Sequence, residues 1–151
     1  MNPVFVRASA LACALGPDLA TAVQRLSGTP AQPDRVSAAG ASWPYFSIPV
    51  AADSWMQRTE SIARAVADDL RSRAALAPRD WAALPCIVGS FSHSVGAWDG
   101  GGWDVLGTPL DFSRSLAAWF GARGPVMAVN TACTSGLSAL EDGAIFLKYV
   151  R

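Results

Sequence analysis

A cysteine among small residues is the part of this sequence best suited to chemistry. Cys133 lies in the small-residue segment 131–136, directly after the apolar run 126–129. A short apolar run suits a buried strand, and small residues leave room for a sharp turn that leads into a helix. The pattern predicts a nucleophile elbow, in which a reactive side chain stands on a tight strand-to-helix turn.

The position of Cys133 at a helix start would make its sulfur a reagent. The unpaired N–H groups and the positive dipole end of a helix N-terminus favour thiolate over thiol, and they can also stabilise an oxyanion. We therefore predict that Cys133 is a nucleophile toward thioesters. The alternative is a small buried core cysteine, which is common in proteins. The residues expected to shape the elbow and its oxyanion site are Thr131, Ala132, Thr134, Ser135 and Gly136.

These residues also carry a resemblance to a known family. Gly124-Pro125, the segment 131–136 and Ala139-Leu140 are close to the active-site signature of the β-ketoacyl-[acyl carrier protein] synthases, members of the thiolase-like superfamily. Weaker similarities lie in the opening segment 4–16 and in the segment 87–90, which resembles the family's third strand. The resemblance spans the chain, and it corresponds to about the first half of a complete synthase.

The resemblance implies a fold and a reaction. We expect one α/β domain over residues 1–151, the N-terminal half of a thiolase-like fold, with a mixed or parallel sheet and helices on both faces. Cys133 would accept an acyl chain as a thioester for decarboxylative condensation in fatty acid or polyketide biosynthesis. The substrate would arrive on the phosphopantetheine of an acyl carrier protein, and the chain would need no cofactor of its own. The Cys133 N–H would supply one oxyanion donor, with Asn130 and Thr131 shaping the turn.

Full activity would need groups from elsewhere. Family members use two histidines and a lysine from their second half, and the second oxyanion donor also comes from there. Here His93 and Lys148 match none of these residues. We therefore expect a second half or a partner chain, as a homodimer or as a heterodimer with a synthase-type chain, joined in the family through the strand 125–129.

Two other functions stay open. The chain could be a noncatalytic assembly subunit of a synthase heterodimer, although inactive partner subunits of the family typically lack the cysteine. It could instead be a small acyl hydrolase in which His93 is the base for Cys133, which requires hydrogen-bond distance between the two side chains. An ordinary loop histidine is the alternative for His93.

Alternating strands and helices indicate an α/β domain. We expect a loop over 29–41, rich in Pro, Ala, Gly and Ser, and extended chain over 45–50 interrupted by proline. The helix that starts at Asp53 or Ser54 carries an apolar repeat at Ile62, Val66 and Leu70. The strands expected are 3–8, 84–89 and 125–129, and the other helices are 18–26, 110–120 and 134–149.

Composition excludes several classes of function. The 151 residues are 51% hydrophobic, with 12 basic and 12 acidic side chains, so no net field draws the chain to nucleic acid or anionic lipid. No apolar run reaches membrane-spanning length. The opening segment fits a helix entry better than a secretory signal. The three cysteines lack metal spacing, and we expect a reducing, cytoplasmic setting in which Cys13 and Cys86 are core thiols.

Three surface features have expected roles. The glycine-rich segment 96–103 lacks phosphate-loop spacing and is predicted to be a surface loop, with Trp98 and Trp103 in it. Large apolar residues of helix 134–149 would be exposed without a second half, which promotes association. A group of arginines is expected to form a solvated helix face, with docking of an acidic carrier protein as the alternative: Arg58, Arg64, Arg71, Arg73 and Arg79.

Overall fold

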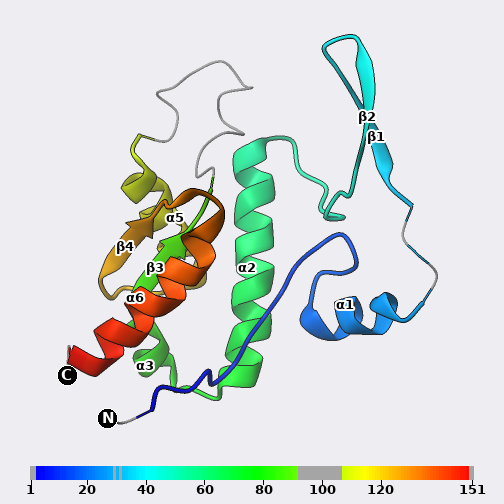
Figure 1. Ribbon diagram of the computed structural model, residues 1–151. Coiled ribbons are helices and arrows are strands. Elements are labelled where there is room, and N and C mark those ends of the chain that lie inside the picture. The colour runs from blue at the N-terminus through cyan, green and yellow to red at the C-terminus, as the bar shows by residue number, and fades with distance from the viewer. Residues whose placement is uncertain (1–2, 29, 31, 92–106, 150–151) are drawn as a thin grey trace. The chain divides into compact units, whose positions relative to one another are not determined.

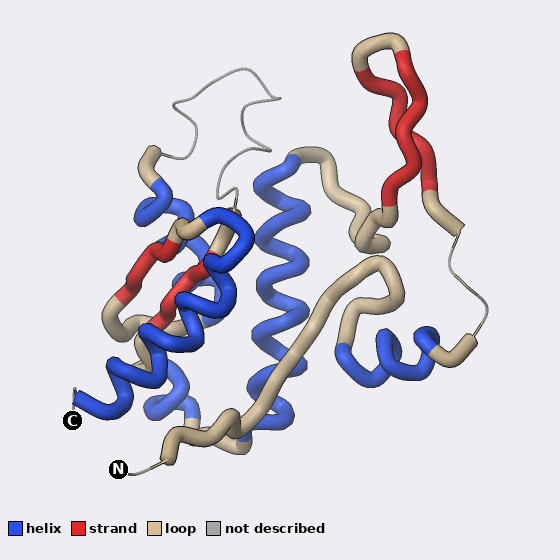
Figure 2. Tube along the Cα trace, viewed as in Figure 1, coloured by secondary structure: helices blue, strands red, loops and turns tan. Residues whose placement is uncertain are grey.

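The computed structural model describes residues 3–28, 30, 32–91 and 107–149 (Figures 1 and 2). The chain divides into two compact units, and most contacts of each unit are between its own residues. One contains Met1–Arg7 with Ala75–Arg151, and the other contains Ala8–Ala74. The expectation of one domain over 1–151 stays a prediction. Among the described residues, no helix combines the length and apolarity needed to cross a membrane.

A parallel pair of strands organises the unit that contains Cys133. Strand β3 (Cys86–Gly89) pairs with β4 (Val126–Val129), so that Cys86 lies opposite Val126 and Gly89 opposite Val129. Helices α5 (Pro109–Phe120) and α6 (Ser135–Tyr149) both contact the pair, and Figure 1 draws α6 in front of it and α5 behind. Two faces of a short parallel pair are thus covered, as the sequence predicted for this part of the chain.

Local signals fix the ends of α5. The Thr108 side chain accepts a hydrogen bond from the Asp111 amide, and the Asp111 carboxylate accepts one from the Thr108 amide, which is a capping box. Gly121 ends the helix with φ 74°, in the left-handed region that glycine adopts without strain. The observed bounds agree with the predicted helix over 110–120 to within one residue.

A tryptophan connects α3 to the end of α5. Helix α3 (Pro78–Ala82) carries Trp81, which is buried and donates from Nε1 to the Phe120 carbonyl at 2.8 Å. Gly124 lies so close to the carbonyls of Ala83 and Leu84 that a side chain at this position would collide with them. These contacts fix the chain just before β4.

The predicted strand over 3–8 is not formed. Residues 3–8 have no strand assignment, and the Phe5 and Val6 side chains are 79% and 81% exposed. A strand needs a neighbouring backbone to satisfy its polar groups, and β3 and β4 pair only with each other among the described residues. Arg7 instead donates to the Ala75 carbonyl at 3.3 Å.

Among its described residues, the second unit contains helices α1 and α2. Helix α1 (Leu19–Leu26) begins after Asp18, whose carboxylate accepts from the Thr21 amide at 2.8 Å; this bond lowers the Asp18 pKa. Helix α2 (Trp55–Ala74) buries Ala63 and Ala67, while the larger side chains of its predicted apolar repeat are half-buried. Both helices were predicted, and the small residues beside the repeat are the most buried part of α2.

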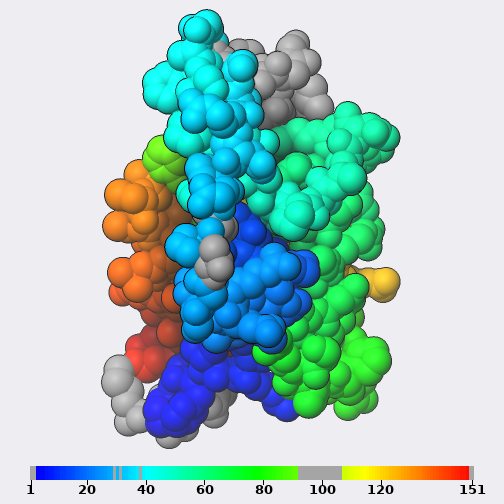
Figure 3. Space-filling model, turned by 90° about the vertical axis from the view of Figure 1, so that its right-hand side faces the viewer, coloured from blue at the N-terminus to red at the C-terminus, as the bar shows by residue number. Residues whose placement is uncertain are grey.

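A β-hairpin replaces the predicted loop over 29–41. Strands β1 (Asp34–Ala38) and β2 (Ala41–Tyr45) pair antiparallel, with Val36 opposite Trp43. Ala39 and Gly40 form the turn with φ 52° and 75°, the pattern of a type I′ turn. Figure 3 shows the hairpin in cyan at the top of the view.

The prediction was wrong here because an Ala-Gly pair is a weak turn signal and a strand proline usually argues against pairing. Pro44 lies opposite Arg35 in a ribbon of two strands, where a missing N–H can point to an outer edge. Of the segment 45–50, which was expected to be extended, only Tyr45 belongs to a strand, as the last residue of β2, and residues 46–50 form an irregular connection.

Candidate active site

Cys133 lies on the turn between β4 and α6. After β4 ends at Val129, two residues lead into the 3₁₀ turn η1 (Ala132–Thr134), and α6 starts at Ser135. Cys133 is exposed and has a free thiol. The predicted order of strand, tight turn and helix is confirmed, with the strand and helix bounds each shifted by one residue.

One residue of this turn has a left-handed backbone conformation. Ala132 has φ 54°, in the left-handed region that costs a residue with a Cβ roughly 1–2 kcal/mol. Asn130 Oδ1 accepts from the Ala132 amide at 3.5 Å, and the Thr134 amide donates to the Thr131 carbonyl at 3.3 Å. The left-handed residue immediately before Cys133 was not predicted, because nothing about an alanine signals it.

Hydroxyl groups crowd the first turn of α6. Thr131 Oγ1 and Ser138 Oγ lie 3.1 Å apart, and Thr134 Oγ1 donates to the Thr131 carbonyl at 2.8 Å. Ser135 is the buried member of the group, with 2% of its surface exposed. The sequence indicated small residues that leave space, and the structure shows that several of them are also hydrogen-bonded to one another.

Nothing in the surroundings of Gly136 requires a glycine at this position. It is exposed, and a Cβ built there would meet nothing within 4 Å. Gly89, which was not singled out as a site residue, is the close-approach glycine of the site, because its missing side chain lets the Ser135 carbonyl lie against the end of β3. The role of Gly136 stays a prediction.

The other two thiols have different surroundings. Cys86 is half-buried in β3, and burial raises the pKa of its thiol. Cys13 is half-buried and pairs with Gly16 through two backbone hydrogen bonds. Cys133 is thus the most accessible of the three. Over the ranges that the structure describes, no cluster of His, Cys, Asp and Glu is arranged to hold a metal ion.

The structure leaves some sequence candidates undescribed and places another far from the turn. His93 and the glycine-rich segment 96–103, with Trp98 and Trp103, lie outside the described residues, so a Cys–His pair stays a hypothesis. Lys148 lies in the last turn of α6, with Nζ 4.9 Å from the centre of the Tyr149 ring. It is more than three turns of helix away from Cys133, as expected from its position in the sequence.

The group of arginines is largely paired. On α2, Arg64 pairs with Glu60, Arg71 with Asp68, and Arg73 with Asp69, all at helical spacing. Arg58 donates to the carbonyls of Ile48 and Val50, and Arg79 pairs with Asp80. The expected solvated helix face therefore carries ion pairs between its own side chains on α2, and docking of an acidic carrier protein stays a hypothesis.

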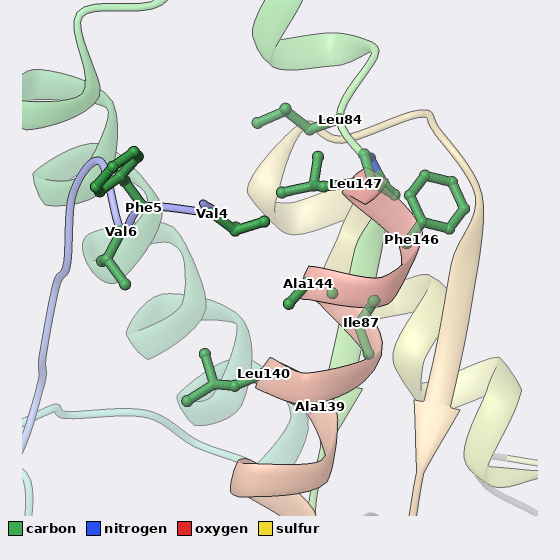
Figure 4. Close-up of a pocket in the computed structure, with 12 residues that line it drawn as sticks. Val4, Phe5, Val6, Leu84, Ile87, Ala139, Leu140, Ala144, Phe146 and Leu147 are labelled. Carbon is green, nitrogen blue, oxygen red and sulfur yellow. The ribbon is translucent and has the colours of Figure 1, made fainter. Parts of the chain in front are cut away.

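An apolar cavity of about 500 Å³ runs beside α6 rather than at the turn (Figure 4). Its walls include the N-terminal segment with Val4 and Val6, the residue Leu84, and one flank of α6 with Leu140 and Leu147. Residues 130–136 do not line it. The cavity and the cysteine turn are thus separate features of the same helix.

Part of the chain that includes the cysteine turn matches a known protein family. Residues 107–148 match the family model described as the beta-ketoacyl synthase, N-terminal domain. This segment includes α5, β4, the turn with Cys133 and nearly all of α6. No curated protein and no solved structure gives a match. The resemblance seen in the sequence is confirmed for this segment, and it suggests a synthase-type transferase function.

Proposed function

From the match of residues 107–148 to the β-ketoacyl synthase N-terminal domain, we propose that Cys133 is the acyl acceptor of a synthase-type acyltransferase. The observation that carries the proposal is the exposure of this thiol on the turn between β4 and α6, inside the matched segment. A thiol at a helix start meets N–H groups that favour negative charge. Cys13 and Cys86 lack this setting.

The proposed step is a thioester exchange. The Cys133 thiolate attacks the carbonyl carbon of an acyl thioester, and a tetrahedral oxyanion forms. The bond between that carbon and the donor sulfur then breaks. The acyl group ends on Sγ, and the donor leaves as a thiolate that takes up the proton that Cys133 lost. No oxidant, reductant or metal takes part in this exchange.

The turn would serve as the nucleophile elbow. In this proposal the Cys133 N–H is one oxyanion donor, and a second half or partner chain supplies the other. The surrounding residues set the backbone path that presents the sulfur: Thr131, Ala132, Thr134, Ser135 and Gly136. The hydrogen bonds among Thr131, Thr134 and Ser135 support this assignment, because they restrict the turn to one conformation.

The acyl donor proposed is a thioester on the phosphopantetheine arm of an acyl carrier protein, and the chain itself needs no cofactor. The acyl group would then enter decarboxylative condensation in fatty acid or polyketide biosynthesis, with groups from a second half. Homodimers or heterodimers with a synthase-type chain are the proposed assemblies. In the described part of the chain β4 pairs along one edge only, which leaves an edge for such a contact. Unpaired cysteines fit a cytoplasmic setting.

A role as an assembly subunit is the second candidate. Leu137 and Leu140 on α6 are 70% and 69% exposed, and exposed apolar groups of this size favour a protein partner. An assembly subunit needs no acyl transfer, so the two candidates differ in the fate of Cys133 when a thioester is supplied.

The intact mass of the folded chain after incubation with acyl carrier thioesters tests the proposal. We expect a mass increase of one acyl group. The increase should disappear in Cys133→Ala, because the accepting sulfur is gone. It should persist in Cys13→Ala, the matched control, which removes a thiol away from the turn.

Two results would reject the catalytic proposal. One is a folded chain that gains no acyl group from any thioester, which favours the assembly role. The other is an increase that survives in Cys133→Ala, which places the accepting group elsewhere. Circular dichroism on each sample shows whether the chain is folded.

A further inference from the structure

Ser135 has an unusual position for a polar residue of a surface helix. Its side chain is buried, with 2% exposed, although it belongs to the first turn of α6. Its Oγ accepts a hydrogen bond from the Thr131 amide at 2.9 Å and donates toward the Ala132 carbonyl at 2.7 Å. Both partners are in the short segment between β4 and Cys133, so one hydroxyl holds both sides of the turn.

The same hydroxyl also reaches the neighbouring strand. Ser135 Oγ lies 3.3 Å from the carbonyl of Ser90, the residue after β3, and the Ser90 amide donates to the Val129 carbonyl at 3.1 Å. The absence of a side chain at Gly89 lets the Ser135 backbone lie against this strand end. Ser135 therefore lies against the carboxyl end of β3, and the Ser90 amide in turn connects that end to the end of β4, at the edge of the strand pair where α/β proteins commonly place their sites.

Ala132, whose carbonyl accepts the Ser135 hydrogen bond, is also the residue with the strained backbone. Ala132 adopts φ 54°, and a strained backbone persists only where its surroundings determine it. Ser135 Oγ binds the carbonyl of Ala132 and the amide of Thr131, the groups on each side of the Thr131–Ala132 segment. Without these bonds the turn would relax, and Cys133 would leave its place at the start of α6.

We propose that Ser135 is a positioning residue that fixes Cys133 at the N-terminal end of α6 by bonding the two sides of the turn while it lies against the end of β3. This inference rests on the proposed function for its importance, because a fixed sulfur matters when it must attack a carbonyl. Its geometric content concerns only Cys133 and can be measured without any acyl donor.

Site-resolved alkylation of the three cysteines by iodoacetamide tests the inference, with each peptide quantified by mass spectrometry. The rate is followed from about pH 6 to about pH 9. In Ser135→Ala we expect Cys133 to react about two- to fivefold more slowly near neutral pH, because a relaxed turn moves its sulfur away from the N–H groups of the helix N-terminus, whose effect on a negative charge has this size. In Ser135→Thr, which keeps the hydroxyl, the profile of Cys133 should stay that of the parent.

Ser113→Ala is the matched control. Ser113 is also a fully buried helical serine of the same unit, with Oγ donating to the Pro109 carbonyl at 2.9 Å, but it lies in α5. It should leave the Cys133 profile unchanged. Cys86 is an internal control, since its half-buried thiol in β3 reports on loosening of the strand pair.

Each outcome decides the matter. Slower alkylation of Cys133 in Ser135→Ala, with Cys86 and Ser113→Ala unchanged, supports positioning. An unchanged Cys133 profile, or parallel changes at Cys133 and Cys86, overturns it. If Ser135→Ala does not fold, Ser135→Thr decides, and a slowed Cys133 there overturns the inference. If the parent chain accepts no acyl group but Ser135→Ala still slows the alkylation of Cys133, the proposed function is rejected and the positioning role stands.

Discussion

At the residue scale, Cys133 differs from the other thiols by its surroundings. The sequence indicated a turn around it because small residues follow an apolar run, and the structure confirms the turn. Two details were not predictable. The left-handed Ala132 is set by bonds to its neighbours, and the Ser135–Ser90 contact joins residues 45 positions apart. Short-range pattern shows where a turn lies, whereas its conformation depends on what packs against it.

The strain at Ala132 predicts a stabilising substitution. Ala132→Gly should raise the free energy of unfolding by up to about 1 kcal/mol, because glycine adopts φ 54° without steric cost and that gain exceeds its larger loss of backbone entropy. Urea denaturation measures the change.

Ala128→Gly is the matched control for this substitution. Ala128 lies in β4 and does not have a positive φ, so the same change should destabilise by about 0.5–1 kcal/mol. Equal destabilisation by both substitutions would contradict a strained Ala132.

At the element scale, α1, α2, α5 and α6 were predicted well because their ends depend on neighbouring residues, whereas the five-residue helix α3 was not predicted because it is too short to show an apolar period. The Thr108–Asp111 capping box and Gly121 define α5 within the sequence itself. The strands were predicted less well. The segment 3–8 has the apolar pattern of a strand but no partner strand among the described residues. The β1–β2 hairpin forms around an alanine that sequence rules do not mark as a turn residue. Strand formation is decided by pairing, which a local pattern does not contain.

The cap of α5 predicts a dependence on acid. Hydrogen bonds from the Thr108 amide and hydroxyl lower the pKa of Asp111 below its ordinary 3.8. A carboxylate with a lowered pKa in the folded state stabilises the fold above the unfolded value. That contribution is lost as the pH falls from about 4 through the folded pKa. Asp111→Asn should therefore flatten the loss of stability in this range.

Urea midpoints at a series of pH values from about 6 down to about 2.5 measure this effect. Thr108→Ala removes the hydroxyl donor and should also reduce the slope, though less than Asp111→Asn, because the Thr108 amide remains. The cap would have no part in the acid response if Asp111→Asn kept the parent slope.

At the scale of the whole molecule, α6 exposes a group of large apolar side chains. The sequence predicted that large apolar residues of helix 134–149 would be uncovered, and Leu137, Leu140, Ile145 and Leu147 are exposed in the structure. The division of contacts between two units was not predicted, because apolar periodicity shows which face of a helix is buried but not which segments share a core.

We expect these side chains to drive self-association. The double substitution Leu137→Lys with Leu140→Lys should lower the apparent association constant in analytical ultracentrifugation by about tenfold or more, since it replaces two exposed apolar groups by charges that resist desolvation.

The control places the same change on another helix. Val23 and Leu26 of α1 are 55% and 70% exposed, so Val23→Lys with Leu26→Lys adds equal charge at similarly exposed apolar positions. Association that responds equally to both double variants would reflect net charge rather than the α6 face.

The central claim is that the fold makes Cys133 an acyl acceptor, and the most direct measurement compares its acylation in the folded and the unfolded chain. The chain is incubated with an acyl thioester in buffer and in urea, and the acyl group on each cysteine is quantified by peptide mass spectrometry. The account predicts that Cys133 is acylated faster than Cys13 and Cys86 in buffer and that this preference disappears in urea. Equal rates at the three thiols in the folded chain, or a Cys133 preference that persists in urea, would contradict it.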